Sequence, residues 1–491
     1  MKKEELFKVL EDIDPNSVAK ARAYKKKRNG IWIKAVAAVA CLSVIIGAIW
    51  GAPSLRNIGT EEDYNTGTKE DYSKSAQAIK TVLAVYPTML GQGMSADEFM
   101  SNNNNVDWWD SYNDKRLASM GLQEGMNGYY SKMMQQLLAS EEDNTVCSPL
   151  NTYMTLSMLA EITDGTTREQ ILKVLNVKDI ETLRKNIATI WNANYVDIPI
   201  LTSILANSIW LKDGVDFNEG ALDTLASDYY ASSFVGDPAS KEMNDALRKW
   251  TDDNTGGLLK EYIGELKLNP ATVIGLMSTI YYKALWNNAF IESETKEETF
   301  HGVNGDTIVD MMHKYEHPTS LYHTDRFASV GLSLDYSGTM YFFLPNEGVD
   351  VNSLLSDEDV FKAISDDFDD PNLSFLKVNM SIPKFRVSAE TDLNNAIEAL
   401  GIKDVFDPKL ADFSPLVKDA KDMFVSKTTH AAMVEIDEKG VTGAAYTAVL
   451  ADGMGAEPDE IYEFVLDRPF MFVITGADGS VLFAGVVRNI N

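Results

Sequence analysis

Two histidines in this chain have the spacing of metal ligands. His313 and His317 flank Glu316 in the pattern His-x-x-Glu-His, which is typical of inverted zinc peptidases. That chemistry places both imidazoles on one face of a helix and takes a further acidic ligand from a second helix. Pro318 follows directly, and the neighbouring apolar residues favour a strand and a turn. We therefore predict a surface turn with two exposed histidines and no metal site, with a metallopeptidase as an alternative.

The rest of the sequence offers little for catalysis. Its five histidines are not accompanied by a Gly-x-Ser-x-Gly elbow, a phosphate-binding loop or a dinucleotide-binding glycine pattern. The 491 residues include 44 basic and 73 acidic ones, and the net charge of −29 disfavours nucleic acid as a partner. The two cysteines, Cys41 and Cys147, lie too far apart in the predicted topology to form a disulfide. The absence of those motifs argues against the hydrolase and nucleotide-binding classes that such motifs mark.

The N-terminus differs in charge from the rest of the chain. Residues 1–50 carry ten basic and five acidic side chains, whereas residues 51–491 carry 34 and 68. Residues 31–50 form an apolar run with Lys34 as its only charge, and as a helix of ~1.5 Å per residue this run spans a bilayer core. Basic residues precede it and acidic ones follow, so the positive-inside rule predicts an extracellular C-terminal part. We predict a cytoplasmic head over 1–30, a transmembrane segment over 31–50 and a tether over 51–75.

Two other interpretations of the apolar run stay open. In a cleaved signal peptide the cut would fall among small residues, but Trp50 and Pro53 flank the small pair Gly51-Ala52. A lipoprotein cut before Cys41 is the second possibility, but the apolar run continues past this residue. We favour the uncleaved anchor. The head also resembles the short cytoplasmic segments of Gram-positive bacterial membrane proteins.

The exported part has the pattern of one α+β domain. Apolar spacing predicts a helix over residues 126–140 and another from Pro149, and it favours a short helix from Ala76 that ends before Pro87. Segments rich in β-branched and aromatic residues dominate the second half of the chain. Because helices come first and strands follow, we expect segregated helices and sheets rather than β-α-β units. The predicted strands lie within residues 272–282, 329–344, 374–387 and 463–489.

A segment near the C-terminus, Glu435–Thr447, resembles the hinge of the reactive-centre loop of serpins, a family of serine-protease inhibitors with a mobile loop. The resemblance covers residues 122–491, with 76–121 as an N-terminal extension and the loop at about 436–467. It implies the serpin fold, in which helices surround a large central mixed sheet and further sheets. Other matching segments follow the order of the family: residues 144–150, 206–210, 281–286, 383–385, 400–402, 411–414, 426–430, 468–472 and 482–487.

The resemblance implies a mechanism in which a protease cleaves the loop and forms an acyl-enzyme. The freed strand then inserts into the central sheet before deacylation, and every second residue of the strand enters the core. No charged residue or proline occurs between Val441 and Ala451, so burial of alternate residues costs little, which favours an inhibitor. The hinge residues that the resemblance assigns are Glu438, Gly440, Val441, Gly443, Ala444, Ala445 and Thr447, of which Val441, Gly443, Ala445 and Thr447 would point inward.

The resemblance also assigns residues around the loop. Ser148, Ser278 and His430 occupy the shutter beneath the sheet, where we expect a hydrogen-bonding latch rather than a nucleophile and base. Trp286 lies at the breach, where the loop enters the sheet. Ser278 stands where the family usually has Asn, and Ala284 stands where it usually has Gly. These departures concern the efficiency of insertion rather than the class of protein.

Family spacing counted from the hinge places the scissile bond at Met454–Gly455, with a margin of about two residues. No Lys or Arg occurs between Gly440 and Asp467, so the acidic pocket of a trypsin-like enzyme has nothing to bind. We expect an elastase-, chymotrypsin- or subtilisin-like target with an apolar pocket. The acidic residues that follow the bond would steer a basic protease to the loop, and a merely solvated loop accounts for them equally well: Glu457, Asp459, Glu460, Glu463 and Asp467.

Together with the anchor, the resemblance implies a monomeric inhibitor at the cell membrane that forms a covalent one-to-one complex with an extracellular serine protease. We therefore expect a protein that is not an enzyme and that takes no cofactor. Two alternatives besides the metallopeptidase stay open. A non-inhibitory serpin acting as a surface binding protein would be cleaved without forming a stable complex. A signalling protein would report cleavage of its loop through residues 1–28.

Overall fold

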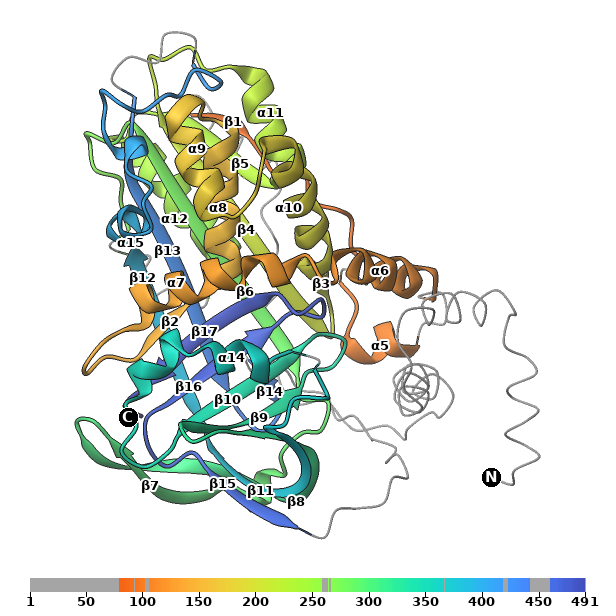
Figure 1. The fold of residues 1–491 in the computed structure, drawn as a ribbon. Coiled ribbons are helices and arrows are strands. Elements are labelled where there is room, and N and C mark those ends of the chain that lie inside the picture. The colour runs from red at the N-terminus through yellow and green to blue at the C-terminus, as the bar shows by residue number, and fades with distance from the viewer. Residues whose placement is uncertain are drawn as a thin grey trace. The chain divides into compact units, whose positions relative to one another are not determined.

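The computed structural model describes residues 79–490 except for positions 92, 102–105, 258–263, 265, 366, 418–422 and 442–459. The predicted cytoplasmic head, transmembrane segment and tether lie outside the described residues. Among the residues that are described, no helix is long and apolar enough to cross a membrane. Two large β-sheets, here named sheet A and sheet B, form the centre of the described part, with helices packed around them (Figure 1).

Sheet A contains long strands that are buried on both faces. Every residue of β4 (Leu201–Lys212) except Lys212 is buried, and β4 runs antiparallel to β6 (Ile274–Leu285). β6 in turn runs parallel to β13 (Val425–Ile436), so the sheet is mixed. The other strands are β1 (Lys80–Val82), β3 (Val196–Ile198), β5 (Ala231–Gly236), β12 (Phe385–Asp392) and β14 (Gly440–Val441). Among the described residues the order is β1-β5-β4-β6-β14-β13-β12, with β3 paired to β4.

The last two strands of the chain lie in the interior of sheet B. Its strands are β2 (Thr145–Cys147), β7 (Lys296–Gly302), β8 (Gly305–His323), β9 (Phe327–Ser333), β10 (Thr339–Pro345), β11 (Leu373–Pro383), β15 (Ile461–Val465), β16 (Phe470–Thr475) and β17 (Val481–Val487). The order within the described residues is β15-β11-β8-β9-β10-β16-β17-β2, with β7 paired to β8. Every residue of β16 and β17 is buried, so these two strands form part of the hydrophobic core. Cys147 on β2 is a buried free thiol.

The helices pack against the sheets, and α8 (Pro149–Glu161) is the most deeply buried of them. All of its residues except Glu161 are buried, and it contacts β4 and β6 of sheet A and β17 of sheet B. Ser148 caps it by accepting a hydrogen bond from the backbone of Asn151, with Pro149 as the first residue. The predicted helices over 126–140 and from Pro149 are confirmed. The others are α5 (Ala96–Ser101), α6 (Val106–Ser119), α7 (Asn127–Leu138), α9 (Gly165–Val174), α10 (Ile180–Asn194), α11 (Glu219–Asp228), α12 (Lys241–Asp253), α14 (Glu358–Ala363) and α15 (Asn394–Ala399).

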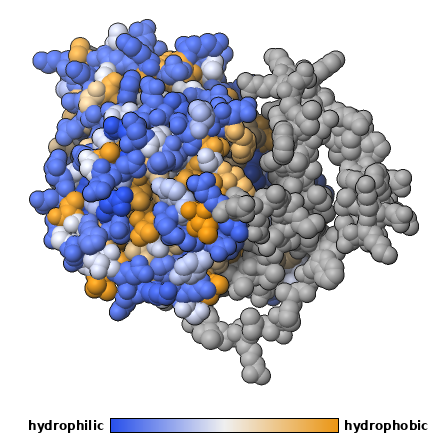
Figure 2. Space-filling model, turned by 60° about the horizontal axis from the view of Figure 1, so that its bottom comes forward, coloured by the Kyte–Doolittle hydropathy of each residue, from blue (hydrophilic) through white to orange (hydrophobic). Residues whose placement is uncertain are grey.

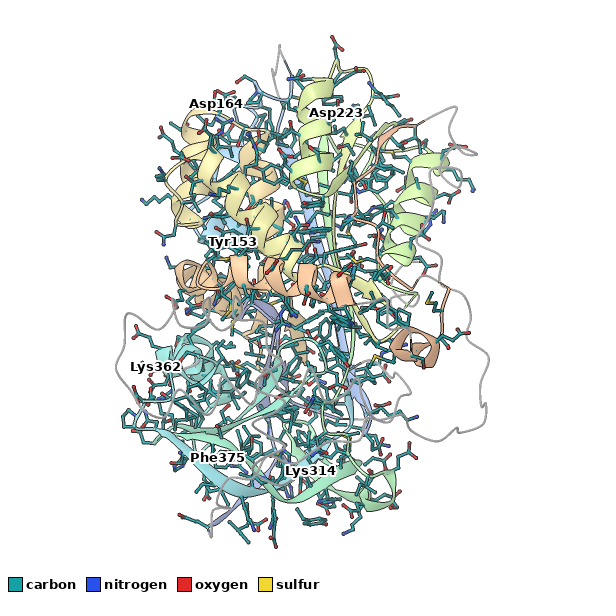
Figure 3. The ribbon with its side chains drawn as sticks, turned by 90° about the vertical axis from the view of Figure 1, so that its right-hand side faces the viewer. Tyr153, Asp164, Asp223, Lys314, Lys362 and Phe375 are labelled. Carbon is teal, nitrogen blue, oxygen red and sulfur yellow. The ribbon has the colours of Figure 1, made fainter. Side chains whose placement is uncertain are left out.

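The face shown in Figure 2 is mainly hydrophilic, as the acidic composition leads one to expect. Hydrophobic residues are dispersed among the hydrophilic ones on this face rather than gathered into one area. Singly exposed apolar side chains are ordinary on protein surfaces. Phe375 on β11, which Figure 3 labels, is one of them.

The N-terminal extension differs from the prediction at its start. The helix expected between Ala76 and Pro87 is wrong for its described part, since Lys80–Val82 form strand β1. This strand pairs antiparallel with residues 233–235 of β5, the neighbouring strand of sheet A. The open edge of β5 offers backbone partners, and pairing with it outweighs the weak helical spacing of a short segment.

Tyr86 fastens this extension to the body. Its ring stacks on Trp191 and Tyr195 of the α10 region with centroid distances of 5.8 and 5.2 Å. We expect Tyr86→Ala to lower the free energy of unfolding by about 2 kcal/mol because it removes these contacts. Denaturant unfolding measures this, and Val85→Ala is the control because Val85 is 62% exposed. Equal effects of the two substitutions would contradict the anchoring role.

Candidate functional site

The start of the loop is already part of sheet A. β14 lies between β6 and β13 and runs antiparallel to both: Gly440 pairs with Leu285, and Val441 pairs with Ala284 and with Ile436. A Cβ on Gly440 would lie 2.2 Å from the carbonyl oxygen of Ala284, so only glycine fits at this approach. Val441 is 1% exposed, which agrees with the inward direction that the sequence predicts for it.

Beyond β14 the direct pairing of β6 with β13 does not resume at once. The direct pairing of β6 with β13 ends at Thr279 and Ala431, and the pairing of β6 with β14 begins at Ala284. Residues 280–283 of β6 and residues 432–435 of β13 separate these two pairings within the described part of the chain. A strand that continued from Val441 would occupy this interval.

Trp286 is hydrogen-bonded to the turn that leads into β14. Its indole Nε1 donates a hydrogen bond to the carbonyl oxygen of Asp437 at 2.8 Å, and its backbone N–H donates to that of Lys439 at 2.9 Å. The Asp437 carboxylate in turn accepts from the backbone N–H groups of Lys439 and Gly440. The turn that leads into β14 is therefore fixed from both sides.

Glu438 is the buried charge of the hinge. Its carboxylate accepts hydrogen bonds from Lys384 Nζ at 2.8 Å and from Thr295 Oγ1 at 2.7 Å. Burial by itself raises the pKa of Glu438, but Lys384 and Thr295 outweigh it and hold the pKa below its ordinary value. The side chain therefore stays ionised and ties the hinge to the residue between β11 and β12 and to the residue before β7.

The shutter residues named from the sequence lie together beneath the sheet. The Nε2 atom of His430 on β13 accepts a hydrogen bond from the backbone N–H of Ser148 at 2.9 Å, which places the ring proton on Nδ1. Nδ1 lies 3.3 Å from Ser278 Oγ on β6. His430 on β13 thus connects the N-terminus of α8 with β6, which is the hydrogen-bonding latch that the sequence analysis expects.

Sequence reasoning missed the polar residues that extend this latch. Asn207 on β4 donates to Asn151 Oδ1 at 3.2 Å and accepts from Thr155 Oγ1 at 2.8 Å, and Asn151 also donates to the carbonyl oxygen of Thr279. All four residues are buried. Polar residues at helical spacing on the apolar helix α8 were the available signal, because buried polar groups need partners.

A pH dependence follows from the burial of His430. Burial lowers the pKa of His430 to about 4 from its ordinary value of 6.5. Between these two values the unfolded chain binds a proton that the folded protein does not bind, so the free energy of unfolding falls as the pH is lowered, by about 3 kcal/mol in all. Urea unfolding of the protein and of His430→Gln at several pH values measures this. The variant should lose correspondingly less stability between pH 6.5 and 4, and identical slopes would contradict the assignment.

The possible zinc motif lies on a strand instead of a turn. His313 and His317 both belong to β8, where the spacing does not give the helical geometry that such a site requires. His313 is buried and contacts Ser381 Oγ at 3.0 Å and Glu298 at 3.1 Å, so the prediction that it is exposed is wrong. The neighbouring Lys314, labelled in Figure 3, donates to the carbonyl oxygen of Ala289, and burial lowers its pKa to about 8. Within the described residues no group of three or more potential metal ligands occurs.

The remaining loop assignments lie outside the described residues. They are the hinge positions Gly443, Ala444, Ala445 and Thr447 and the reactive bond Met454–Gly455. The structure describes the chain again from Glu460, and β15, the strand that follows, runs parallel to β11. The loop therefore connects the interior of sheet A to the edge of sheet B.

A family model described as "Serpin (serine protease inhibitor)" matches residues 125–490. The chain belongs to the serpin family. Serpin-ZX of Arabidopsis thaliana is 30% identical over 371 residues, which cover 71% of this chain and 92% of that protein. The leukocyte elastase inhibitor of Sus scrofa is 29% identical over 358 residues, covering 70% and 92%. The native crystal structure of the thermophilic serpin tengpin superposes with a TM-score of 0.66 at 24% identity, covering 74% of this chain and 93% of that one.

The predicted serpin fold is confirmed, with helices around a large mixed sheet and a second sheet beside it. Serpins are in general protease inhibitors rather than enzymes. The described residues that the sequence analysis assigned to the hinge, breach and shutter lie on or next to β6, β13 and β14, except for Ser148, which precedes α8 and contacts His430. The loop begins between β6 and β13.

Proposed function

We propose that this serpin inhibits an extracellular serine protease irreversibly by acting as a suicide substrate. The protease cleaves the loop and is held as an acyl-enzyme while the cleaved strand inserts into sheet A. The observation that carries the proposal is β14, since its pairing and the buried Val441 are what we expect where an inserting strand begins. No cofactor enters this mechanism.

The pairing at the hinge supports insertion of the cleaved strand between β6 and β13. β14 is antiparallel to both β6 and β13, so each further residue that enters adds ladder pairing to two strands at once. About 15 residues at ~3.3 Å each would carry the acyl end roughly 50 Å along the sheet. The new pairing and burial supply the driving force, released from a strained starting state.

The composition of the loop indicates which class of protease it would inhibit. The stretch between Lys439 and Arg468 has no basic residue, and Met454 at the proposed bond suits an apolar pocket. The similarity to a protein named leukocyte elastase inhibitor is consistent with an elastase-like target. Chymotrypsin-like and subtilisin-like enzymes have pockets of the same character.

We further propose that residues 31–50 anchor the serpin in a bacterial cell membrane as a single-pass protein with its N-terminus in the cytoplasm. The support is the length of the apolar run and the excess of basic residues before it. A monomeric inhibitor held in this way would guard the cell surface. Alkaline extraction of membranes tests the anchor, because an integral protein stays in the membrane and a peripheral one is released.

The inhibitory proposal is tested by mixing the full chain, purified in mild detergent, with elastase, chymotrypsin, subtilisin and trypsin. Denaturing gels should show a covalent band of summed mass with one or more of the first three. Mass spectrometry of the denatured samples should show a C-terminal peptide that starts at Gly455. Complete cleavage without a covalent band would contradict inhibition and support a non-inhibitory serpin that acts as a surface binding protein.

A further inference from the structure

A cavity of about 880 Å³ lies where β6 and β13 begin. One side is formed by the first two turns of α12 and by residues 267–272, which lead directly into β6. The other side is formed by Asp392 at the end of β12 and by Ser426 and Lys427 of β13. The cavity therefore spans the line along which β6 and β13 would separate.

The ladder is irregular at this place. The register of the β6–β13 pairing shifts between Val425 and Lys427, which leaves Ser426 at the irregularity. The backbone N–H of Val273 donates to Ser426 Oγ at 2.9 Å and so joins the two sides by a side-chain contact. A bulge interrupts the ladder locally, so a ligand that contacts both sides would strengthen a weak part of the pairing.

The lining of the cavity is cationic in a protein whose net charge is −29. Asp392 is the acidic residue of the lining, and it is exposed. Three cations lie on the α12 and β6 side and one lies on the β13 side, so the two sides repel each other in the absence of an anion. The four basic residues are Lys241, Arg248, Lys267 and Lys427.

Two of these basic residues have no ion-pair partner among the described residues. Lys241 and Arg248 share the carboxylate of Asp245. Lys267 and Lys427 form no ion pair within the part of the chain that the structure describes. Positive charge therefore exceeds negative charge among the lining residues even when Asp245 is counted with them.

The N-terminus of α12 adds to the cationic lining. This end of the helix, capped by Ser240, borders the cavity and carries the positive end of the helix dipole. Lysine ammonium groups and free N–H donors are the groups that bind phosphate-like anions.

We propose that this cavity binds a small multivalent oxyanion of the phosphate class, which bridges Lys267 and Lys427 and keeps β6 and β13 together. Binding of the anion does not depend on the proposed inhibitory function, whereas its effect on insertion rests on that function. An anion that binds only the closed sheet slows opening by the factor 1 + [L]/Kd. At a concentration of ten times Kd, insertion should slow about tenfold.

The experiment uses the full chain with inorganic phosphate and with short-chain polyphosphate, at an ionic strength held constant with sodium chloride. Binding is measured by calorimetry and by the thermal midpoint, neither of which needs a protease. Insertion is measured as the rate of covalent complex formation with an inhibited protease. The test variant combines Lys267→Gln with Lys427→Gln. The control is Lys409→Gln, which removes an exposed lysine outside the cavity.

We expect phosphate to raise the midpoint of the protein and of Lys409→Gln, and to slow complex formation by both. The double variant should lose at least about nine-tenths of the affinity. Tighter binding of polyphosphate would indicate a phosphate polymer as the source, and equal binding would indicate a free ion. Phosphate stabilises proteins in general by exclusion from their surface, so an equal shift in all three proteins would overturn the site. Binding without any covalent complex would leave the site standing and overturn the inhibitory function instead.

Discussion

Ala445→Arg is expected to turn this serpin from an inhibitor into a substrate. Val441 is buried between β6 and β13, and side chains of a strand alternate, so Ala445 would face the same interior after insertion. An unpaired arginine there costs several kcal/mol, which delays insertion until the acyl-enzyme has hydrolysed. The number of serpin molecules consumed per inhibited protease should rise at least about tenfold. Quantitative gels of cleaved and complexed protein measure this ratio.

Ala444→Arg provides a matched control for that experiment. The substitution is identical and lies one residue earlier, on the face that alternation directs outward. It should leave the ratio of complex to cleaved serpin nearly unchanged. If Ala444→Arg impaired inhibition more than Ala445→Arg, the register that β14 sets would not continue along the loop, and the insertion proposal would fail.

Met454→Arg is expected to redirect the serpin toward trypsin. The acidic pocket of a trypsin-like enzyme needs a basic side chain at the cleaved bond, and the loop lacks one. The rate of trypsin inhibition should rise by a factor on the order of 10³ or more, while inhibition of elastase-like enzymes should fall. Progress curves with chromogenic substrates measure both rates.

Met454→Leu is the control, since it keeps an apolar residue of similar size and should retain the original targets. The register is checked in the same samples, because the released peptide should start at Gly455. A peptide that starts elsewhere, with no gain of trypsin inhibition by Met454→Arg, would move the reactive bond to another position.

The hinge and shutter show why this site could be predicted from the sequence. Gly440 and Val441 sit in a local pattern of small and β-branched residues whose alternation has a direct structural meaning, and the structure buries Val441. Ser278 and His430 are far apart in the chain, and their contact follows from the resemblance to a family whose topology brings β6 beside β13. Periodicity alone gives no such long-range pairing.

The errors share a physical cause, which is tertiary pairing that overrides local pattern. Residues 80–82 have helical spacing but pair with the edge of β5. His313 was expected at the surface because Pro318 suggested a turn, yet the strand continues through this proline to His323. The hydrogen bonds of Asn151 and Asn207 join α8 to β4. The polar residues of α8 signal that buried partners exist, but the sequence does not say that one of them lies on β4.

Strands β16 and β17 have a consequence for what happens to a captured enzyme. They follow the proposed bond, and they are buried between β10 and β2. Cleavage would leave this C-terminal fragment seated in sheet B, so the cut molecule stays in one piece. The acyl bond itself forms on Met454, whose fragment includes the apolar run of residues 31–50. With the proposed anchor in place, a captured enzyme would therefore remain attached to the cell instead of diffusing away, and the number of attached complexes would record how many protease molecules the cell has inhibited.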